Sequence, residues 1–249
     1  MGFEGRVAVV TGGTRGLGAA VSRRLLEAGT HVVALYVGND VAASDFADSV
    51  RGLPGELITR QADIGEARAC SESVKFATDR YGRLDHLVNN AGLLIENSLR
   101  KVTGDEWNRL ISVNLSAAFH LAQAAMPHMI EAGFGRIVNV SSVTAVMGNP
   151  VEAAYGAAKA GLHGLTRSLA LTGARKGITA NVVVPGVFET DMTNSMTPEA
   201  QAAVKAMIPV GRRGLPGECA HAVMFLLDDR AGYVTGSVVT VDGGLSMGA

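Results

Sequence analysis

Short apolar runs alternate with longer amphipathic segments along most of this chain. Several short runs are apolar throughout, which is typical of strands buried on both faces of a sheet. The pattern predicts seven strands, at Arg6–Thr11, His31–Tyr36, Glu56–Gln61, Leu84–Asn89, Arg136–Ser141, Thr179–Val184 and Ser237–Val241. It also predicts helices near residues 17–28, 40–51, 66–80, 104–131, 153–175 and 217–227, where apolar positions recur with the helical period.

The order of these elements indicates the fold class. Strands that alternate with helices are typical of a parallel sheet with helices on both faces. We therefore expect an α/β fold, a single doubly wound (Rossmann-type) domain over residues 1–249 with a seven-stranded parallel sheet. No linker composition and no internal repeat divides the chain. Because ligands of such folds bind at the carboxyl ends of the strands, the residues that follow each strand carry the functional information.

A glycine-rich loop follows the first strand and leads into the first helix. It reads T-G-G-T-R-G-L-G from Thr11 to Gly18. Glycines allow a sharp turn and let backbone N–H groups approach a pyrophosphate. An ATP-type loop would place Lys where Ala19 stands, and the G-x-G-x-x-G fingerprint would need Gly at Val21. The remaining pattern, T-G-x-x-x-G-x-G, predicts a dinucleotide site, and the alternative is a simple strand-to-helix turn.

The second strand bears on the choice of cofactor. An acid near its end usually binds the ribose of NAD, but the strand ends in Tyr36 and Val37 without a carboxylate. The nearest acid, Asp40, is placed to begin the next helix. Arg15 lies in the glycine loop, where its guanidinium can bind a 2′-phosphate. These features favour NADP(H), unless Arg15 is a solvated loop charge.

A phenol and an ammonium group lie one helical turn apart in the predicted helix 153–175. Residues four apart share a helix face, so Tyr155 and Lys159 can point at one spot. A nearby ammonium group is expected to lower the pKa of the phenol from its ordinary value of about 10. Ser142, thirteen residues before Tyr155, can hydrogen-bond a substrate carbonyl. Its neighbour Ser141 should point to the opposite face of the strand.

At this point the sequence resembles the short-chain dehydrogenase/reductase family over essentially its whole length. The resemblance rests on Thr11–Gly18, Asp63, Asn89–Gly92, Asn114, Ser142, Tyr155, Lys159, Pro185, Gly186 and Thr190, which occur in the family's order. It implies that Tyr155 is the acid/base, that Lys159 binds the nicotinamide ribose and tunes Tyr155, and that Ser142 orients the carbonyl. It also implies that Asn114 supports a water relay to Lys159.

The same resemblance implies the residues that hold NADP(H). Asp63 and Ile64 would hold the adenine, the Asn90 turn would pack beside adenosine, and the segment from Pro185 to Thr190 would face the nicotinamide. The full expected set is Gly12, Thr14, Arg15, Gly16, Leu17, Gly18, Tyr36, Val37, Asp63, Ile64, Asn90, Ala91, Gly92, Tyr155, Lys159, Pro185, Gly186, Phe188 and Thr190.

Within the family, the segments Phe3–Gly5, Asn181–Met192 and Tyr233–Gly244 are similar to those of 3-oxoacyl-[acyl-carrier-protein] reductases. This resemblance implies NADPH-dependent reduction of a 3-oxoacyl thioester, on acyl carrier protein or CoA, by a homotetramer built on the helices 104–131 and 153–175. Such reductases meet the acidic carrier protein with basic residues beside the active-site mouth, a role that Arg175-Lys176 can fill in part. A second basic site is replaced here by Ala132-Gly133-Phe134. Ketoreductases of polyketide or specialised metabolism, enzymes of free ketones, and a noncatalytic NADP(H)-binding protein remain alternatives.

The bulk properties exclude several other classes. The chain has 249 residues, 47% of them hydrophobic, and a formal net charge of −1, so a basic nucleic-acid-binding face is not expected. Six scattered histidines and two cysteines lack metal-site spacing. No signal peptide or membrane span is predicted, and we expect a cytoplasmic protein without a membrane partner. The segment 188–207, with Met192, Met196 and Met207, is predicted to be a substrate lid; ordinary helix packing is the alternative.

Overall fold

The computed structural model of the chain describes residues 2–190, 193 and 197–247. Its strands are β1 (Val7–Thr11), β2 (His31–Tyr36), β3 (Leu57–Gln61), β4 (His86–Asn89), β5 (Gly135–Val140), β6 (Ile178–Pro185) and β7 (Val238–Val241). They form one seven-stranded sheet in the order β3-β2-β1-β4-β5-β6-β7, and every neighbouring pair is parallel. The predicted fold class is confirmed.

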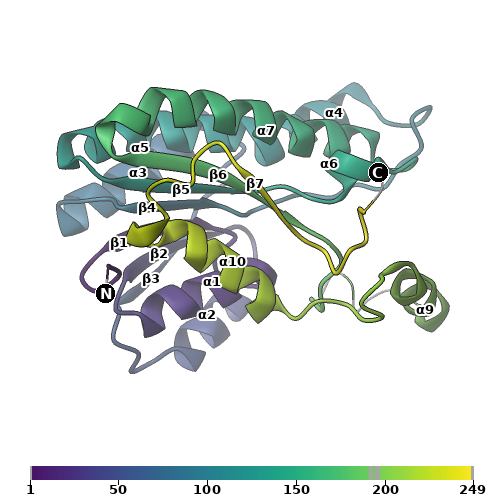
Figure 1. Cartoon of the computed structure of the whole chain (residues 1–249), viewed down its shortest axis with the longest axis horizontal. Coiled ribbons are helices and arrows are strands. Elements are labelled where there is room, and N and C mark those ends of the chain that lie inside the picture. The colour runs from purple at the N-terminus through teal and green to yellow at the C-terminus, as the bar shows by residue number, and fades with distance from the viewer. Residues whose placement is uncertain (1, 191–192, 194–196, 248–249) are drawn as a thin grey trace.

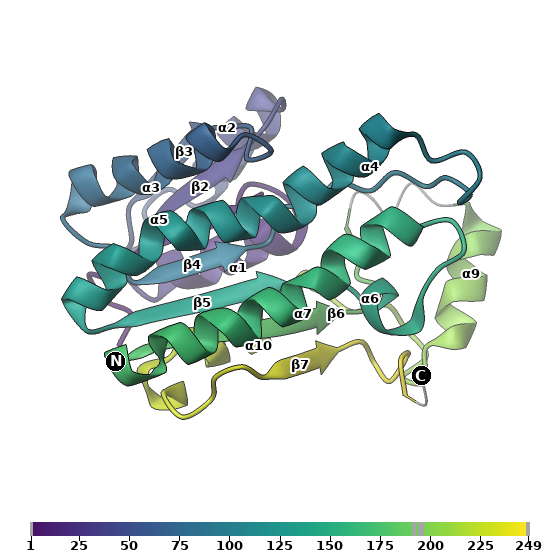
Figure 2. The ribbon, with the colours of Figure 1, turned by 90° about the horizontal axis from the view of Figure 1, so that it is seen from above.

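Helices cover both faces of the sheet (Figures 1 and 2). They are α1 (Gly16–Glu27), α2 (Asp40–Ser49), α3 (Ala67–Tyr81), α4 (Gly104–Ile111), α5 (Ala117–Ala132), α6 (Thr144–Met147), α7 (Ala153–Gly173), α9 (Pro198–Met207) and α10 (Pro216–Leu227), with short turns η1 (Ser112–Ser116), η2 (Ala174–Lys176) and η3 (Asp229–Ala231). Helices α1, α2 and α10 lie on one face, and α3, α5 and α7 lie on the other.

The core has two halves because side chains alternate along each strand. In β1, Ala8 and Val10 pack in the cluster that contains Leu25 of α1. Val7 and Val9 pack in the opposite cluster with residues of α3 and α5. Burial of both faces explains why the strands are continuously apolar.

The predicted helix 104–131 is not a uniform α-helix. A capping box of Thr103 and Glu106 starts α4, and a π-helical turn, η1, separates α4 from α5. Within that turn, the Asn114 amide donates a hydrogen bond to the Leu110 carbonyl oxygen at 3.0 Å. Periodicity did not predict this break, because the segment 112–116 contains neither Gly nor Pro. The short helices α6 and α9 were also not predicted.

Candidate active site

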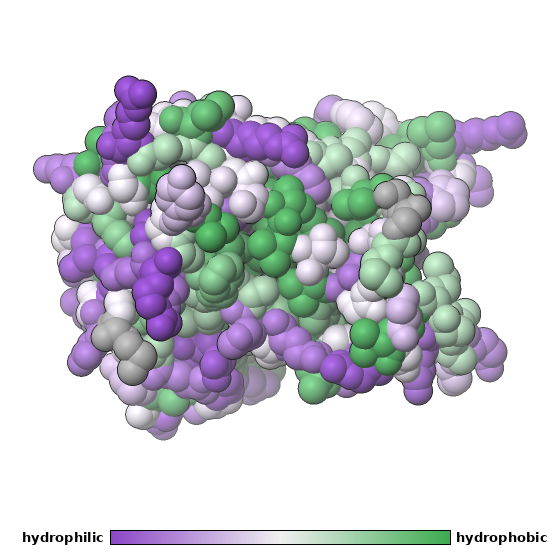
Figure 3. All heavy atoms as spheres, viewed as in Figure 1, coloured by the Kyte–Doolittle hydropathy of each residue, from purple (hydrophilic) through white to green (hydrophobic). Residues whose placement is uncertain are grey.

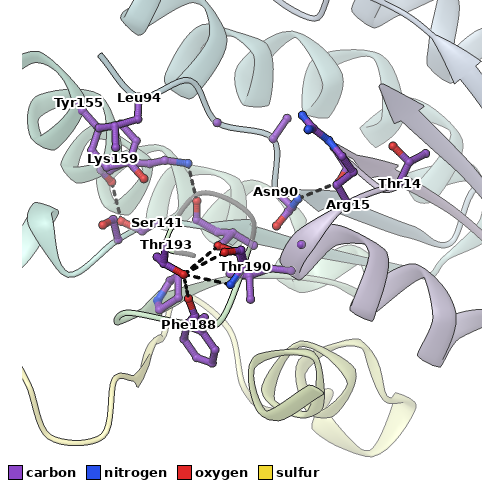
Figure 4. A pocket seen from close by; sticks show the side chains of 18 of the residues that line it. Thr14, Arg15, Asn90, Leu94, Ser141, Tyr155, Lys159, Phe188, Thr190 and Thr193 are labelled. Atoms are coloured by element: carbon purple, nitrogen blue, oxygen red, sulfur yellow. Dashed lines mark hydrogen bonds between the residues drawn. The ribbon is translucent and has the colours of Figure 1, made fainter. Parts of the chain in front are cut away.

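A cleft of about 620 Å³ opens at the carboxyl ends of the strands. The strand order reverses there, between β1 and β4, which is where ligands of doubly wound folds bind. Of the residues predicted from sequence, Gly12, Thr14, Arg15, Gly16, Leu17, Tyr36, Val37, Asn90, Ala91, Gly92, Ser142, Tyr155, Lys159, Pro185, Gly186, Phe188 and Thr190 line it. Tyr155 and Lys159 lie at one end, and Thr14 and Arg15 lie at the other (Figure 4).

The glycine loop leaves no room for a side chain at Gly18. A Cβ atom on Gly18 would lie 2.1 Å from the Gly12 carbonyl oxygen and 2.5 Å from Asn90 Nδ2. The Asn90 amide in turn donates to the Thr11 carbonyl oxygen at 3.0 Å, which ties the loop after β4 to the loop after β1. Gly12 has φ +60°, a conformation that favours glycine.

The N-terminus of α1 is suited to an anion. Arg15 precedes the helix without making a side-chain cap, and the first turn contains no acidic residue. The first N–H groups of a helix lack partners within the helix and carry partial positive charge. The loop and this helix end therefore fit the pyrophosphate of a dinucleotide.

The ribose end of the cleft lacks an acid at the end of β2. Tyr36 and Val37 line the cleft, whereas Asp40 is the first residue of α2, after the N-cap Asn39. A hydrogen bond to Asp40 raises the pKa of Tyr36, and burial adds to the effect. Arg15 is exposed, and its guanidinium makes no ion pair within the described parts of the chain.

Tyr155 and Ser142 meet in the cleft as their spacing predicts. Burial raises the pKa of Tyr155 to about 12, although a hydrogen bond from Ser142 opposes this shift, and Glu152 adds to it. The predicted lowering of this pKa by Lys159 is therefore wrong for this structure. The ammonium Nζ lies 5.8 Å from the Tyr155 ring centroid and donates to the Val140 carbonyl oxygen at 2.9 Å.

Lys159 is buried behind the phenol. Only 2% of the residue is exposed, and burial lowers the pKa of its ammonium group to about 8. A Cβ atom on Gly92 would lie 3.4 Å from Lys159 Nζ and 3.0 Å from Asn114 Oδ1. Gly92 therefore separates the two polar groups with the smallest possible residue.

Asn114 lies in η1, beside Gly92, and is not among the residues that line the cleft. Its Oδ1 accepts from the Leu93 N–H at 3.1 Å, and its Nδ2 donates to the Leu93 carbonyl oxygen at 2.9 Å. The side chain thus holds the segment that follows β4 against the π-helical turn.

The residues predicted for the adenine are not part of the cleft lining. The Asp63 carboxylate accepts two hydrogen bonds from Arg109, at 3.0 and 2.9 Å. Burial would raise the pKa of Asp63, but the bonds from Arg109 and from the Gly65 N–H lower it. Ile64 is buried in the core on the α3 and α5 side.

The basic pair predicted for the active-site mouth lies elsewhere. Arg175 and Lys176 belong to η2, which one residue separates from the start of β6, whereas the cleft is at the carboxyl end of β6, where Pro185 lines it. The pair therefore lies at the amino ends of the strands, whereas the cleft of its own chain lies at their carboxyl ends.

The structure adds residues that sequence reasoning did not select. Asn39, Leu94, Val140 and Ser141 also line the cleft. The Ser141 hydroxyl donates to the Lys159 carbonyl oxygen at 2.9 Å and lies 3.0 Å from His163 Nε2. Proximity to strand ends could have indicated these positions, but their residue types carry no motif.

Part of the predicted lid lies in the described residues. Phe188, Thr190 and Thr193 line the cleft, and α9 follows them, with Met207 at its exposed end. Met192 and Met196 lie outside the described residues. Across the described helices, none combines the length and apolar character that a membrane span requires.

Comparison with known proteins gives the family. A family model described as enoyl-(acyl carrier protein) reductase matches residues 12–246. The chain is 40% identical over 247 residues to 3-oxoacyl-[acyl-carrier-protein] reductase FabG of Salmonella typhimurium, covering 99% of this chain and 100% of that protein. It is 41% identical over 240 residues to acetoacetyl-CoA reductase of Shinella zoogloeoides, covering 96% and 98% of the two chains. The chain therefore belongs to the short-chain dehydrogenase/reductase family of nicotinamide-dependent oxidoreductases.

Proposed function

We propose that this protein uses NADPH to reduce a 3-oxoacyl thioester to the 3-hydroxyacyl product. The observation that carries the proposal is the meeting of Tyr155, Ser142 and Lys159 in one cleft with the glycine loop. The names of two similar proteins, a 3-oxoacyl-[acyl-carrier-protein] reductase and an acetoacetyl-CoA reductase, support the substrate class. Carbonyl reduction needs a proton donor and a hydride donor side by side. The cleft places the Tyr155 phenol and the glycine loop, which would hold the hydride donor, along one surface.

The chain's own residues supply the acid chemistry. Bound NADPH would supply the hydride, held by the loop from Gly12 to Gly18 and the N-terminus of α1. The raised pKa of Tyr155 keeps its phenol protonated, so it can donate to the carbonyl oxygen. The Ser142 hydroxyl donates a second hydrogen bond to the same oxygen and stabilises the charge that develops there. Lys159 places a buried positive charge behind the phenol.

Replacement of the phenol tests the acid role. Tyr155→Phe keeps the ring and removes the hydroxyl, so turnover of acetoacetyl-CoA should fall about 100-fold or more. Binding of NADPH, measured by calorimetry, should change little, because the glycine loop is intact. A variant with nearly normal turnover would refute the role of Tyr155.

The preference for NADPH rests on Arg15 and on the missing acid at the end of β2. Arg15→Ala should raise the KM for NADPH about tenfold or more, because a charged hydrogen bond to phosphate is lost. The KM for NADH, which has no 2′-phosphate, should barely change. An equal effect on both cofactors would contradict the assignment.

The carrier of the acyl group is decided by a substrate panel. We propose a thioester, and the panel compares acetoacetyl-CoA, an acetoacetyl thioester of acyl carrier protein, and a free cyclic ketone, each with NADPH and NADH. The basic pair Arg175-Lys176 is far from the cleft of its own chain, so carrier-protein docking through this pair would have to serve the cleft of another subunit. Reduction of the cyclic ketone alone would favour a role in specialised metabolism.

We also propose the homotetramer. Trp107 of α4 is 44% exposed, Phe119 of α5 is 45% exposed and Leu171 of α7 is 84% exposed, so none is a core residue of the single chain. Apolar side chains also gather around the edge strand β7 (Figure 3), where Val238 is 39% exposed. Burial between subunits would remove these apolar groups from water. Sedimentation of wild type and Phe119→Glu tests the assembly; a monomeric wild type would contradict it.

A further inference from the structure

A half-buried carboxylate lies one helical turn before the catalytic phenol. Glu152 precedes the first residue of α7, three positions before Tyr155, so the two side chains share a face of the helix. Neither the glycine loop nor the family motifs involve Glu152. Its environment nevertheless connects it to both residues that would contact the substrate carbonyl.

Both oxygens of Glu152 hold the turn that follows β5. Oε2 accepts a hydrogen bond from the Thr144 hydroxyl at 2.8 Å, and Oε1 accepts one from Asn149 Nδ2 at 2.8 Å. The Thr144 N–H donates in turn to Ser142 Oγ at 3.2 Å. Because that bond occupies an acceptor site of Ser142, the hydroxyl hydrogen of Ser142 is left for Tyr155 or a substrate oxygen.

These bonds complete a ring of groups, Glu152, Thr144, Ser142 and Tyr155. The ring closes through the hydrogen bond between Ser142 and Tyr155 and through the helix that carries Tyr155 and Glu152. A carboxylate this close to a phenol opposes its ionisation, since the phenolate would be a second negative charge.

For the reduction proposed above, we propose that Glu152 is a positioning residue that fixes the Ser142 turn against α7 and opposes ionisation of Tyr155. The role rests on the proposed function, but its central consequence is a property of Tyr155 that is measurable without substrate.

Besides the ring's own members, two charged groups among the described residues bear on it, Lys159 and Glu96. Lys159 lies behind Tyr155 on the same helix, and Ser142 faces it from the turn after β5. Glu96, in the segment after β4, faces Glu152, and burial together with this second carboxylate raises the pKa of Glu152 against the opposing bond from Thr144. Replacement of Glu96 should therefore act on Tyr155 more weakly than replacement of Glu152.

The test follows the ionisation of Tyr155 by NMR of protein labelled with ¹³C at the tyrosine ζ carbon, with Tyr155→Phe used for assignment. Glu152→Gln is nearly isosteric and should lower the titration midpoint of Tyr155 by about half a pH unit or more. Glu152→Asp restores the charge and should restore the midpoint in part. A Glu152→Gln resonance that titrates no earlier than the wild-type resonance overturns the proposal, whatever the substrate is.

Thr144→Val separates the hydrogen-bonding effect of Glu152 from its charge effect. This variant loses the hydrogen bond to Glu152 but keeps its carboxylate, so the midpoint of Tyr155 should stay unchanged while kcat for acetoacetyl-CoA falls severalfold. Oxidation of a 3-hydroxybutyryl thioester by NADP⁺ gives a second profile, whose rise with pH should begin earlier in Glu152→Gln. A midpoint in Thr144→Val that shifts as far as in Glu152→Gln would contradict the assigned charge effect. An inactive wild type with the expected NMR shifts would instead refute only the proposed reaction.

Discussion

His86 offers a sharp test of how this fold responds to acid. The imidazole is completely buried in the amino-terminal part of β4, at the end of the sheet opposite the cleft. Neither ring nitrogen has a hydrogen-bond partner in the described part of the chain. The ring stacks on Phe3, with centroids 5.6 Å apart, and meets Phe134 edge-on at 6.0 Å.

The folded state therefore strongly disfavours protonation of His86. Burial lowers its pKa from the ordinary 6.5 to about 3; Asp85 opposes this shift, and nearby arginines add to it. A pKa depressed in the folded state means that the unfolded chain binds the proton first, so stability falls as pH falls below 6.5. Between about pH 7 and about pH 5 the loss is about 2 kcal/mol from this one group, and it does not depend on the folded value as long as that value stays below about 4.

The assay compares two slopes rather than two absolute stabilities. His86→Phe keeps the aromatic contacts and removes the titration, so its free energy of unfolding should lose about 2 kcal/mol less than wild type over that range. Urea denaturation followed by Trp107 fluorescence at both pH values measures the difference. His86→Leu is a second variant, with a smaller apolar side chain. His221→Gln, at an exposed histidine, is the control. Equal acid sensitivity of wild type and both His86 variants would refute the reasoning.

Two further predictions concern the cleft. Gly18→Ala would force a methyl group against the Gly12 carbonyl oxygen, which a Cβ meets at 2.1 Å. We expect a loss of about 1–3 kcal/mol in stability and at least about tenfold weaker NADPH binding by calorimetry. Gly164→Ala, inside α7 where a Cβ meets nothing within 4 Å, should leave NADPH binding unchanged and cause no loss of stability, since Ala favours a helix over Gly. The lowered pKa of Lys159, about 8, predicts that kcat/KM for NADPH falls above that pH as the ammonium loses its proton; a profile flat to about pH 9.5 would contradict this.

The order of strands and helices could be predicted from sequence because both core faces leave a local signature. Strands buried on two sides are apolar at every position, and helices repeat with their own period. The residues that follow strand ends could be predicted for the same reason, since a parallel sheet brings all its carboxyl ends to one edge. The glycine loop and Ser142 were found in this way, and Tyr155 and Lys159 were found from their spacing on one helix.

Local pattern could not predict contacts made by residues far apart in the chain. The pairing of Asp63 with Arg109, the place of Arg175 at the far edge of the sheet, and the raised pKa of Tyr155 all depend on packing around the side chain. The π-helical turn at Asn114 similarly depends on a bond to the segment after β4.

Sequence alone thus determined the fold class, the family and most residues of the candidate site, because periodicity and motif spacing are properties of short segments. The tertiary structure decided which charges meet. The pKa of Tyr155 depends on how much water its neighbours exclude and on a carboxylate held by a separate turn. Desolvation and charge proximity act through space between residues far apart in the chain, so a local sequence pattern does not determine them.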